Sequence, residues 1–443
     1  MRIKLIVLAL FYSLFFLCPG VAWTQATTSL GGHVVDSAGA SVAGANITLM
    51  LPATGTVRTS KTNKSGDYQF SQLLPGRYDL TVSSTGFATS KKTGLNLLVS
   101  QPATVNVALA VATVASEVTV SAGIQPILNT TDATLGNAFS SQQIASLPSE
   151  ARNVPDLLSL QPGVTFLGRT DESTGTQSNG NTATDSRSGA TNGGRSDQSN
   201  ITLDGIDVND INNGYAFTSV LRVSQDAIAE FRVTTSNPNA SEGRSSGAQV
   251  ALVTKSGTNS LHGVVYAYNR NNLFHANDFF NKQNQLANGQ PNVPLKLIRN
   301  VFGASVGGPI KKNTAFFFLN YEGRRDTQGF SSNGTTVPTA SYRAGNLKYC
   351  SVNSGCPPAG VVTLTPADLK MMDPQGIGVN AAVLTLLNTY PLPNNSTVGD
   401  GLNNSGYSFS YVTKRSYNAY TSRLDWNVTG SGKHMIFWRG NLQ

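Results

Sequence analysis

Apolar and polar positions follow three patterns along the chain. An apolar run that is interrupted only at Ser13 extends from Leu5 to Leu17, after a basic start. From residue 30 to about residue 109, apolar residues alternate with polar ones in short stretches between turns. From residue 260 onward the alternating stretches are longer. Because alternation with a period of two is typical of half-buried strands, the second and third patterns predict a chain that is mainly β.

The first pattern is typical of a secretory signal peptide, which we place at residues 1–26. It has a basic start, an apolar centre and an end rich in small residues. A helix of about thirteen residues spans only about 20 Å, and a bilayer core needs roughly 20 residues. A lasting membrane anchor is therefore the less favoured alternative. We expect cleavage after Ala22 or Ala26, and the large residues before Cys18 do not favour lipidation there.

The second pattern predicts an antiparallel β-sandwich over residues 27–112. Tyr78, Leu80 and Val82 fall on one face of a strand, and turn residues such as Ser65-Gly66 recur between such stretches. Regular turns between short alternating strands are the pattern of small sandwiches.

Four segments of this region resemble the carboxypeptidase regulatory-like domain: residues 32–35, 65–70, 74–78 and 86–87. The resemblance implies a non-catalytic sandwich with a carbohydrate-binding-like fold, and the segment offers neither zinc ligands nor a general base. A spacer or interaction module and a sugar-binding module remain alternatives.

Residues 124–257 combine short helices, strands and polar loops. Residues 140–159 have helical spacing, but Pro148 and Pro155 limit it to two short helices at most. Residues 170–200 lack the apolar side chains that a core needs, so we expect a mobile loop. The Leu203–Gly205 turn, the step from helix to strand at Asp226–Val233 and the strand that ends at Thr254-Lys255 resemble the plug domain of TonB-dependent receptors. The resemblance implies an α+β plug.

A short β-prone peptide lies in the expected linker, residues 113–123. It consists of Glu117, Val118, Thr119, Val120, Ser121 and Ala122. The peptide is similar to a TonB box, which implies that the periplasmic TonB protein captures it by strand addition. The alternative is that it forms the last strand of the sandwich.

The third pattern, over residues 258–443, predicts the first strands of a transmembrane β-barrel. In residues 423–428, Leu424, Trp426 and Val428 fall on one face and the polar residues on the other. We expect short turns at Gly308–Lys312 and Thr429–Lys433, and a long extracellular excursion at Arg324–Ser416. Strands of about ten residues joined by alternating short and long connections are typical of outer-membrane barrels. A soluble sandwich is the alternative.

Cys350 and Cys356 are the two cysteines that follow the signal peptide. Export to an oxidising compartment favours a disulfide between them. A metal site needs more ligands than two thiols, and the four histidines are scattered. We therefore expect no metal.

No catalytic motif fits its required context. Gly303–Gly307 matches the G-x-S-x-G pattern around Ser305, but a turn rather than a helix is expected to follow it. Asp204, Asp207 and Asp210 suggest calcium, although their spacing is not that of an EF-hand loop. We expect neither enzymatic activity nor a cofactor. The net charge of +8 comes from dispersed residues, which argues against nucleic acid as a partner.

The order of sandwich, TonB-box-like peptide, plug and barrel strands is similar to that of Oar-like TonB-dependent receptors. The resemblance implies the outer membrane of a Gram-negative bacterium, with TonB, membrane lipid and an extracellular ligand such as a carbohydrate or a peptide as partners. Such barrels have about 22 strands, so we expect this chain to be a fragment with an incomplete barrel. The alternative function is an outer-membrane adhesion or structural protein that binds carbohydrate, without energised transport.

Overall fold

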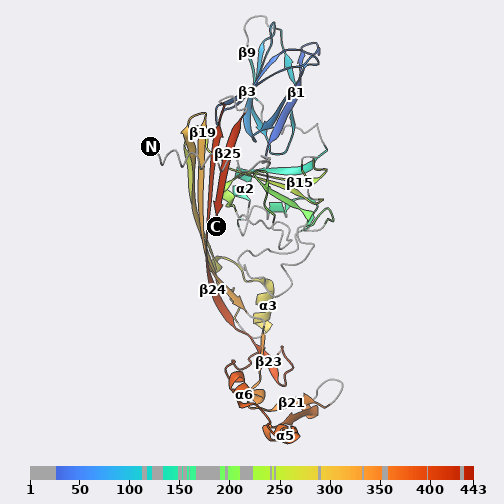
Figure 1. Ribbon diagram of the computed structural model, residues 1–443, viewed down its shortest axis with the longest axis vertical. Coiled ribbons are helices and arrows are strands. Elements are labelled where there is room, and N and C mark those ends of the chain that lie inside the picture. Colours follow the sequence, from blue (N-terminus) through green and yellow to red (C-terminus); the bar gives the residue numbers. More distant parts are fainter. Residues whose placement is uncertain are drawn as a thin grey trace, which may run out of the picture. The chain divides into compact units, whose positions relative to one another are not determined.

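The computed structural model describes most of the chain after residue 25, with gaps. The described residues are 26–111, 117–121, 133–147, 152, 157–158, 160–165, 190–194, 198–209, 223–239, 242–243, 246–287, 291–331, 334–351, 358–396, 398–429 and 434–443. The chain divides into two compact units (Figure 1). The first contains residues 1–266, 302–323 and 417–443, and the second contains residues 267–301 and 324–416.

The first strands form a two-sheet sandwich. They are β1 (Thr28–Asp36), β2 (Asn46–Leu51), β3 (Thr56–Lys61), β4 (Asp67–Leu73), β5 (Gly76–Ser83), β6 (Thr89–Leu97), β7 (Ala103–Thr104), β8 (Val107–Leu109) and β9 (Glu117–Ser121). One sheet has the order β4-β1-β7, with β8 also on β1, and the other has the order β3-β2-β5-β6-β9. The sandwich is not wholly antiparallel, because β7 and β8 run parallel to β1, and β9 runs parallel to β6.

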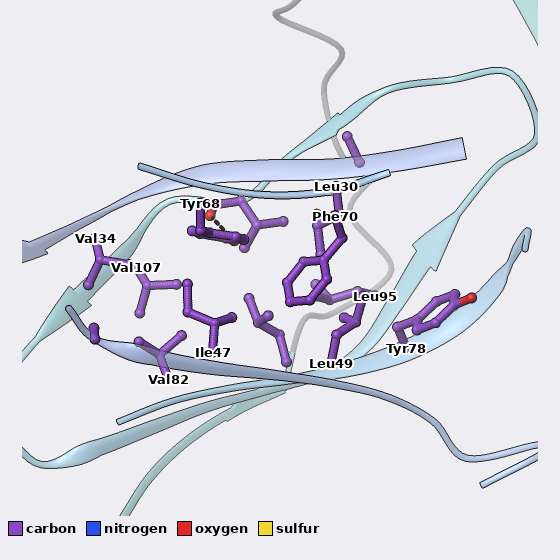
Figure 2. Close-up of a cluster of buried hydrophobic side chains, with 14 of the residues drawn as sticks. Leu30, Val34, Ile47, Leu49, Tyr68, Phe70, Tyr78, Val82, Leu95 and Val107 are labelled. Carbon is purple, nitrogen blue, oxygen red and sulfur yellow. Dashed lines mark hydrogen bonds between the residues drawn. The ribbon is translucent and has the colours of Figure 1, made fainter. Parts of the chain in front are cut away.

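The sandwich core lies between these sheets (Figure 2). Tyr78, Leu80 and Val82 are all buried, as their alternation predicts. Tyr68 is buried too, and its hydroxyl donates a 2.6 Å hydrogen bond to the backbone oxygen of Val105. A Cβ at Gly32 would lie 2.0 Å from that same oxygen, so only glycine lets β1 approach this closely.

A separate sheet, which we call the middle sheet, follows the sandwich. The elements of this region are β10 (Leu135–Ser140), α2 (Ser141–Ser146), β11 (Val164–Thr165), β12 (Ala190–Thr191), β13 (Asn200–Leu203), β14 (Ile206–Asp207), η4 (Gln225–Ala227), β15 (Ile228–Ser236) and β16 (Gln249–Thr254). The sheet order is β10-β15-β16-β13-β14, and β11 pairs with β12 separately. The expected turn at Leu203–Gly205 and the step from η4 into β15 are both present.

A further sheet, which we call the long-stranded sheet, consists of long strands. It contains β17 (His262–Asn271), β18 (Leu297–Lys311), β19 (Ala315–Ser331), β24 (Ser410–Asn427) and β25 (Met435–Leu442), paired in that order. In β24, Leu424 and Trp426 are about half exposed, whereas Arg423, Asp425 and Asn427 are buried. The two faces therefore differ as the alternation predicts.

The boundaries of these strands differ from the expected ones. Gly308–Lys311 belongs to β18, so the turn covers only Lys312–Thr314. A Cβ at Gly263 would lie 2.5 Å from the backbone oxygen of Ser305, and a Cβ at Gly308 would lie 3.4 Å from the Cα of Leu261, the residue before β17 begins. Pro309 therefore lies beyond the end of β17, where β17 needs no backbone donor from β18.

The expected excursion at Arg324–Ser416 is also shorter than predicted. β19 continues to Ser331 and β24 begins at Ser410, with lengths of 17 and 18 residues. Strand pairing joins backbone groups, so it continues past the point where the apolar alternation ends.

Small elements make up most of the remaining second unit. They are η5 (Asn272–Phe274), α3 (Phe279–Ala287), β20 (Thr335–Pro338), α4 (Ala340–Arg343), β21 (Leu347–Cys350), η6 (Pro358–Gly360), β22 (Val361–Leu364), α5 (Pro366–Met372), α6 (Ala381–Leu387) and β23 (Asn404–Tyr407). β20 pairs with β23, and β21 pairs with β22. Within the described part of the chain, no helix is both long and apolar enough to cross a membrane.

A buried carboxylate joins the middle sheet to the sandwich. Glu230 on β15 is 7% exposed, and its Oε1 accepts a 2.9 Å hydrogen bond from the backbone N–H of Val99. Arg232 donates to the oxygen of Val99 at 3.1 Å. Burial raises the pKa of Glu230 to about 7, although the Val99 hydrogen bond and the charge of Arg232 oppose the shift.

This raised pKa predicts a pH-dependent stability. Folding favours the neutral carboxyl group of Glu230. Its contribution to the free energy of unfolding is therefore complete below pH 4.5 and is lost as the pH rises through about 7. Glu230→Gln keeps an acceptor for Val99 and should remove that loss, which is about 3 kcal/mol at most. Thermal unfolding of both proteins at pH 5 and pH 8 measures the difference. Equal losses in the two proteins would show that Glu230 does not titrate in this way.

The Tyr68 hydrogen bond predicts a local stability effect. Tyr68→Phe leaves the oxygen of Val105 buried without this donor, which should cost about 1–3 kcal/mol. Hydrogen exchange of amides in β1 and β4 should accelerate accordingly. Tyr349→Phe, at a tyrosine that is 45% exposed, is the control and should leave exchange unchanged. Unchanged exchange in the Tyr68 variant would contradict the assigned role.

Candidate functional site

The turn between β13 and β14 presents a buried carboxylate to the long-stranded sheet. Asp204 and Gly205 both have positive φ, at 50° and 85°, and Asp204 is 2% exposed. Its Oδ1 accepts the backbone N–H of Thr254 at 2.9 Å, and its Oδ2 accepts the hydroxyl of Thr254 at 2.8 Å. These bonds to the end of β16 fix the direction of the carboxylate.

Arg423 on β24 is the main partner of Asp204. Its Nη1 donates to Asp204 Oδ1 at 3.1 Å and to the backbone oxygen of Thr254 at 3.1 Å. Its Nε and Nη2 donate to Asp425 at 3.0 and 2.9 Å, and its guanidinium lies 5.0 Å from the centre of the Phe437 ring. The guanidinium thus joins the middle sheet to the long-stranded sheet.

Arg439 on β25 completes the group, which we call the Asp204 cluster: Asp204, Thr254, Arg423, Asp425 and Arg439. Arg439 Nε lies 3.0 Å from Asp204 Oδ2 as an ion pair without the alignment of a hydrogen bond. Two arginines and two aspartates balance in formal charge. Removing one partner from a buried ion pair of this kind costs about 3–5 kcal/mol, because it leaves the other charge uncompensated.

A second charged group lies within the same unit. Arg152 donates to Asp226, and its Nε lies 3.5 Å from Glu322 Oε2 on β19. The hydroxyl of Tyr266 donates to the same Glu322 oxygen at 2.8 Å. Ser224 adds a 2.6 Å hydrogen bond to Asn320 on β19. Residues next to η4 therefore contact the long-stranded sheet at a second place.

The TonB-box-like peptide lies at the edge of the sandwich. Glu117–Ser121 forms β9, the outermost strand of its sheet, and pairs in parallel with β6 from Thr89 to Thr93. Ala122 lies outside the described residues. An extended edge strand is compatible both with a last sandwich strand and with a peptide that another protein captures, so its role as a TonB box stays a prediction.

The remaining candidate residues do not gather at one site. Cys350 is disulfide-bonded, but Cys356 lies outside the described residues, so their pairing stays a prediction. Ser305 lies inside β18 rather than at a turn from strand to helix. Asp210 is outside the described residues, and Asp204 accepts a hydrogen bond from Arg423. Among the described residues, no group of three or more His, Cys, Asp and Glu could hold a metal ion.

Sequence reasoning identified the turn at Asp204 and the polar face of β24 but did not connect them. The two positions are separated by 219 residues. An arginine and an aspartate at alternate positions on the inward face of a strand were the only local signal. Such a pair indicates a buried polar surface, but it does not predict which residue of the chain contacts that surface.

Two family models match separate parts of the chain. The carboxypeptidase regulatory-like domain matches residues 29–110, and the outer membrane beta barrel domain matches residues 253–443. The first range covers β1 to β8, and the second begins at the end of β16 and includes all the long strands. The chain is thus mainly β, with an N-terminal β domain and an outer-membrane barrel domain.

A curated relative supports the same assignment. The chain is 24% identical over 316 residues to the TonB-dependent transporter Oar of Myxococcus xanthus, a match that covers 68% of this chain and 27% of Oar. The matched region therefore spans about a quarter of the relative's length.

Two solved structures each resemble about a fifth of the chain. A putative carbohydrate binding protein from Bacteroides uniformis is 17% identical, with 19% of this chain and 41% of that chain covered and a TM-score of 0.17. Catechol 1,2-dioxygenase from Pseudomonas arvilla C-1 is 12% identical, with 22% and 55% covered and a TM-score of 0.17. Scores this low carry no argument about function. The two domain matches and the likeness to Oar together support an Oar-like TonB-dependent receptor.

Proposed function

We propose that this chain takes part in TonB-dependent uptake of an extracellular ligand across the outer membrane. In this proposal, residues 1–26 direct export, residues 27–112 form the periplasmic sandwich, and residues 124–257 form a plug. Residues 258–443 contribute barrel strands. The match to an outer membrane barrel domain and the likeness to Oar point to the outer membrane.

The Asp204 cluster is the observation that carries the proposal. It holds a turn of the proposed plug against two strands of the barrel domain through buried charges. Such contacts favour one arrangement of the turn against the strands, because a charge that stays buried without its partner is costly. They suit a plug that stays closed at rest and needs energy from outside the outer membrane to move.

The proposed route for this energy is the peptide Glu117–Ala122 in the linker before the plug. TonB would add a strand to this peptide and pull on the chain that leads to β10. The edge position of β9 supports the proposal, because an edge strand has unpaired backbone groups on one side. An adhesion or structural protein without energised transport is the competing function, and it requires no response to TonB.

The first prediction concerns the closure of the barrel by the proposed plug. In the complete receptor, Asp204→Asn should leave Arg423 and Arg439 with one carboxylate, weakening the contact by about 3–5 kcal/mol. Cells should then admit antibiotics too large for general porins, which growth inhibition measures. Asp207→Asn, at an exposed aspartate of β14 just after the same turn, is the matched control and should not sensitise the cells. Equal sensitivity of the two variants would contradict the sealing role.

The second prediction concerns energy transfer. Val118→Pro with Val120→Pro removes two backbone donors, so TonB should no longer pair with the peptide. Uptake should fall to the level of cells without TonB, while ligand binding at the cell surface persists. Val118→Thr with Val120→Thr keeps the donors and the β-branched shape, and should retain uptake. Normal uptake by the proline variant would contradict TonB-dependent transport through this peptide and would favour the adhesion function.

A further inference from the structure

Four aromatic rings form a continuous ladder in the second unit. Tyr407 ends β23, Phe409 lies in the link to β24, Tyr411 lies in β24 and Phe330 lies in β19. The ring centres of Tyr407 and Phe409 are 5.7 Å apart, those of Phe409 and Tyr411 are 5.8 Å apart, and those of Tyr411 and Phe330 are 5.5 Å apart. Neighbouring rings are inclined by only 23° to 35°.

The middle of the ladder is open to solvent. Phe409 is 41% exposed and Tyr411 is 49% exposed. Large apolar side chains that lie side by side in water are unfavourable, and such patches commonly mark binding sites. The ladder therefore offers a surface for a ligand with an apolar face.

The backbone around the ladder is held in place. The side chain of Asn394 donates to the backbone oxygen of Ser408 at 2.8 Å and accepts the backbone N–H of Ser408 at 2.7 Å. Strand β23 also pairs with β20, where Thr335 lies opposite Tyr407. These contacts fix the backbone immediately before Phe409, which lowers the entropy cost of ordering its ring when a ligand binds.

An arginine with an unused donor lies beside the rings. The guanidinium carbon of Arg415 is 5.9 Å from the centre of the Phe330 ring. Its Nη1 is buried and has no hydrogen-bond partner among the described residues. A buried cationic donor without a partner is costly, and a carboxylate is the group whose geometry suits guanidinium best.

We propose that the ladder and Arg415 bind an acidic saccharide, with the apolar faces of the sugar rings against Phe409 and Tyr411 and a sugar carboxylate on Arg415. This inference rests on the proposed function and names the chemical class of the ligand. A saccharide of uronic acids supplies both features in one repeating unit. A purely apolar ligand would leave the donor of Arg415 unused.

The alternation of β24 argues against membrane lipid as the occupant. Arg423, Asp425 and Asn427 are buried on one face of this strand, and Leu424 and Trp426 are exposed on the other. Tyr411 and Arg415 are spaced from Arg423 by even numbers of residues, so they share its face. In a barrel, the face opposite the exposed apolar band is turned away from lipid.

The test measures binding of uronic acid tetramers to the full chain in detergent, without TonB or an energised membrane. Tetramers of galacturonic, mannuronic and guluronic acid are compared by calorimetry with their methyl esters, which keep the apolar faces and lose the charge. At least one acid should bind, and its ester should bind about tenfold more weakly, as expected for one charged hydrogen bond. Because this assay needs no uptake, its failure and a failure of TonB-dependent transport are distinguishable.

Variants assign the binding to the proposed residues. Phe409→Ala and Tyr411→Ala should each weaken binding about tenfold, whereas Phe409→Tyr, which keeps the ring, should bind as the parent does. Arg415→Gln should bind the acid and the ester equally. Tyr349→Ala, at another exposed tyrosine of the same unit, should change nothing. The inference is overturned if no acid binds, if the ladder variants bind normally, or if the ladder variants instead lose binding to lipid vesicles.

Discussion

The buried ion pair between Asp204 and Arg423 is the interaction on which the proposed mechanism depends. A charge leaves water only when its partners are in place, so the contact favours one arrangement of the turn against the strand. Thr254 and Asp425 occupy the remaining hydrogen-bonding groups, which prevents either charge from being left uncompensated. Buried charges from two strands of the long-stranded sheet thereby fix the position of the β13–β14 turn in the middle sheet.

The sandwich is held together differently. Its core is apolar and lies between two sheets, and Tyr68 contributes a single buried hydrogen bond across it. Glu230 and Arg232 connect its 99–101 segment to the middle sheet through charged side chains. A module with its own apolar core that contacts the middle sheet through polar groups suits the separate periplasmic domain proposed above.

Local sequence patterns were sufficient for the strands but not for the sites. Alternation located the buried face of β5 and both faces of β24, because side-chain direction follows directly from strand geometry. It did not locate the ends of β18 and β19, since backbone pairing continues through polar residues. The partner of Asp204 could not be predicted, because contacts between residues 219 positions apart depend on the tertiary fold. The aromatic ladder had a visible signal in Tyr407, Phe409 and Tyr411, although Phe330 and Arg415 join it only in the folded chain.

The most direct test of the account is the force needed to displace the plug. In the complete receptor reconstituted in a membrane, the segment Glu117–Ala122 would be pulled from the periplasmic side by single-molecule force spectroscopy. The account predicts an extraction step that ends before the barrel strands unfold, with a lower force when Arg423 is replaced by methionine. An unchanged force in that variant, or simultaneous unfolding of plug and barrel, would contradict the claim that the buried charges hold a movable plug.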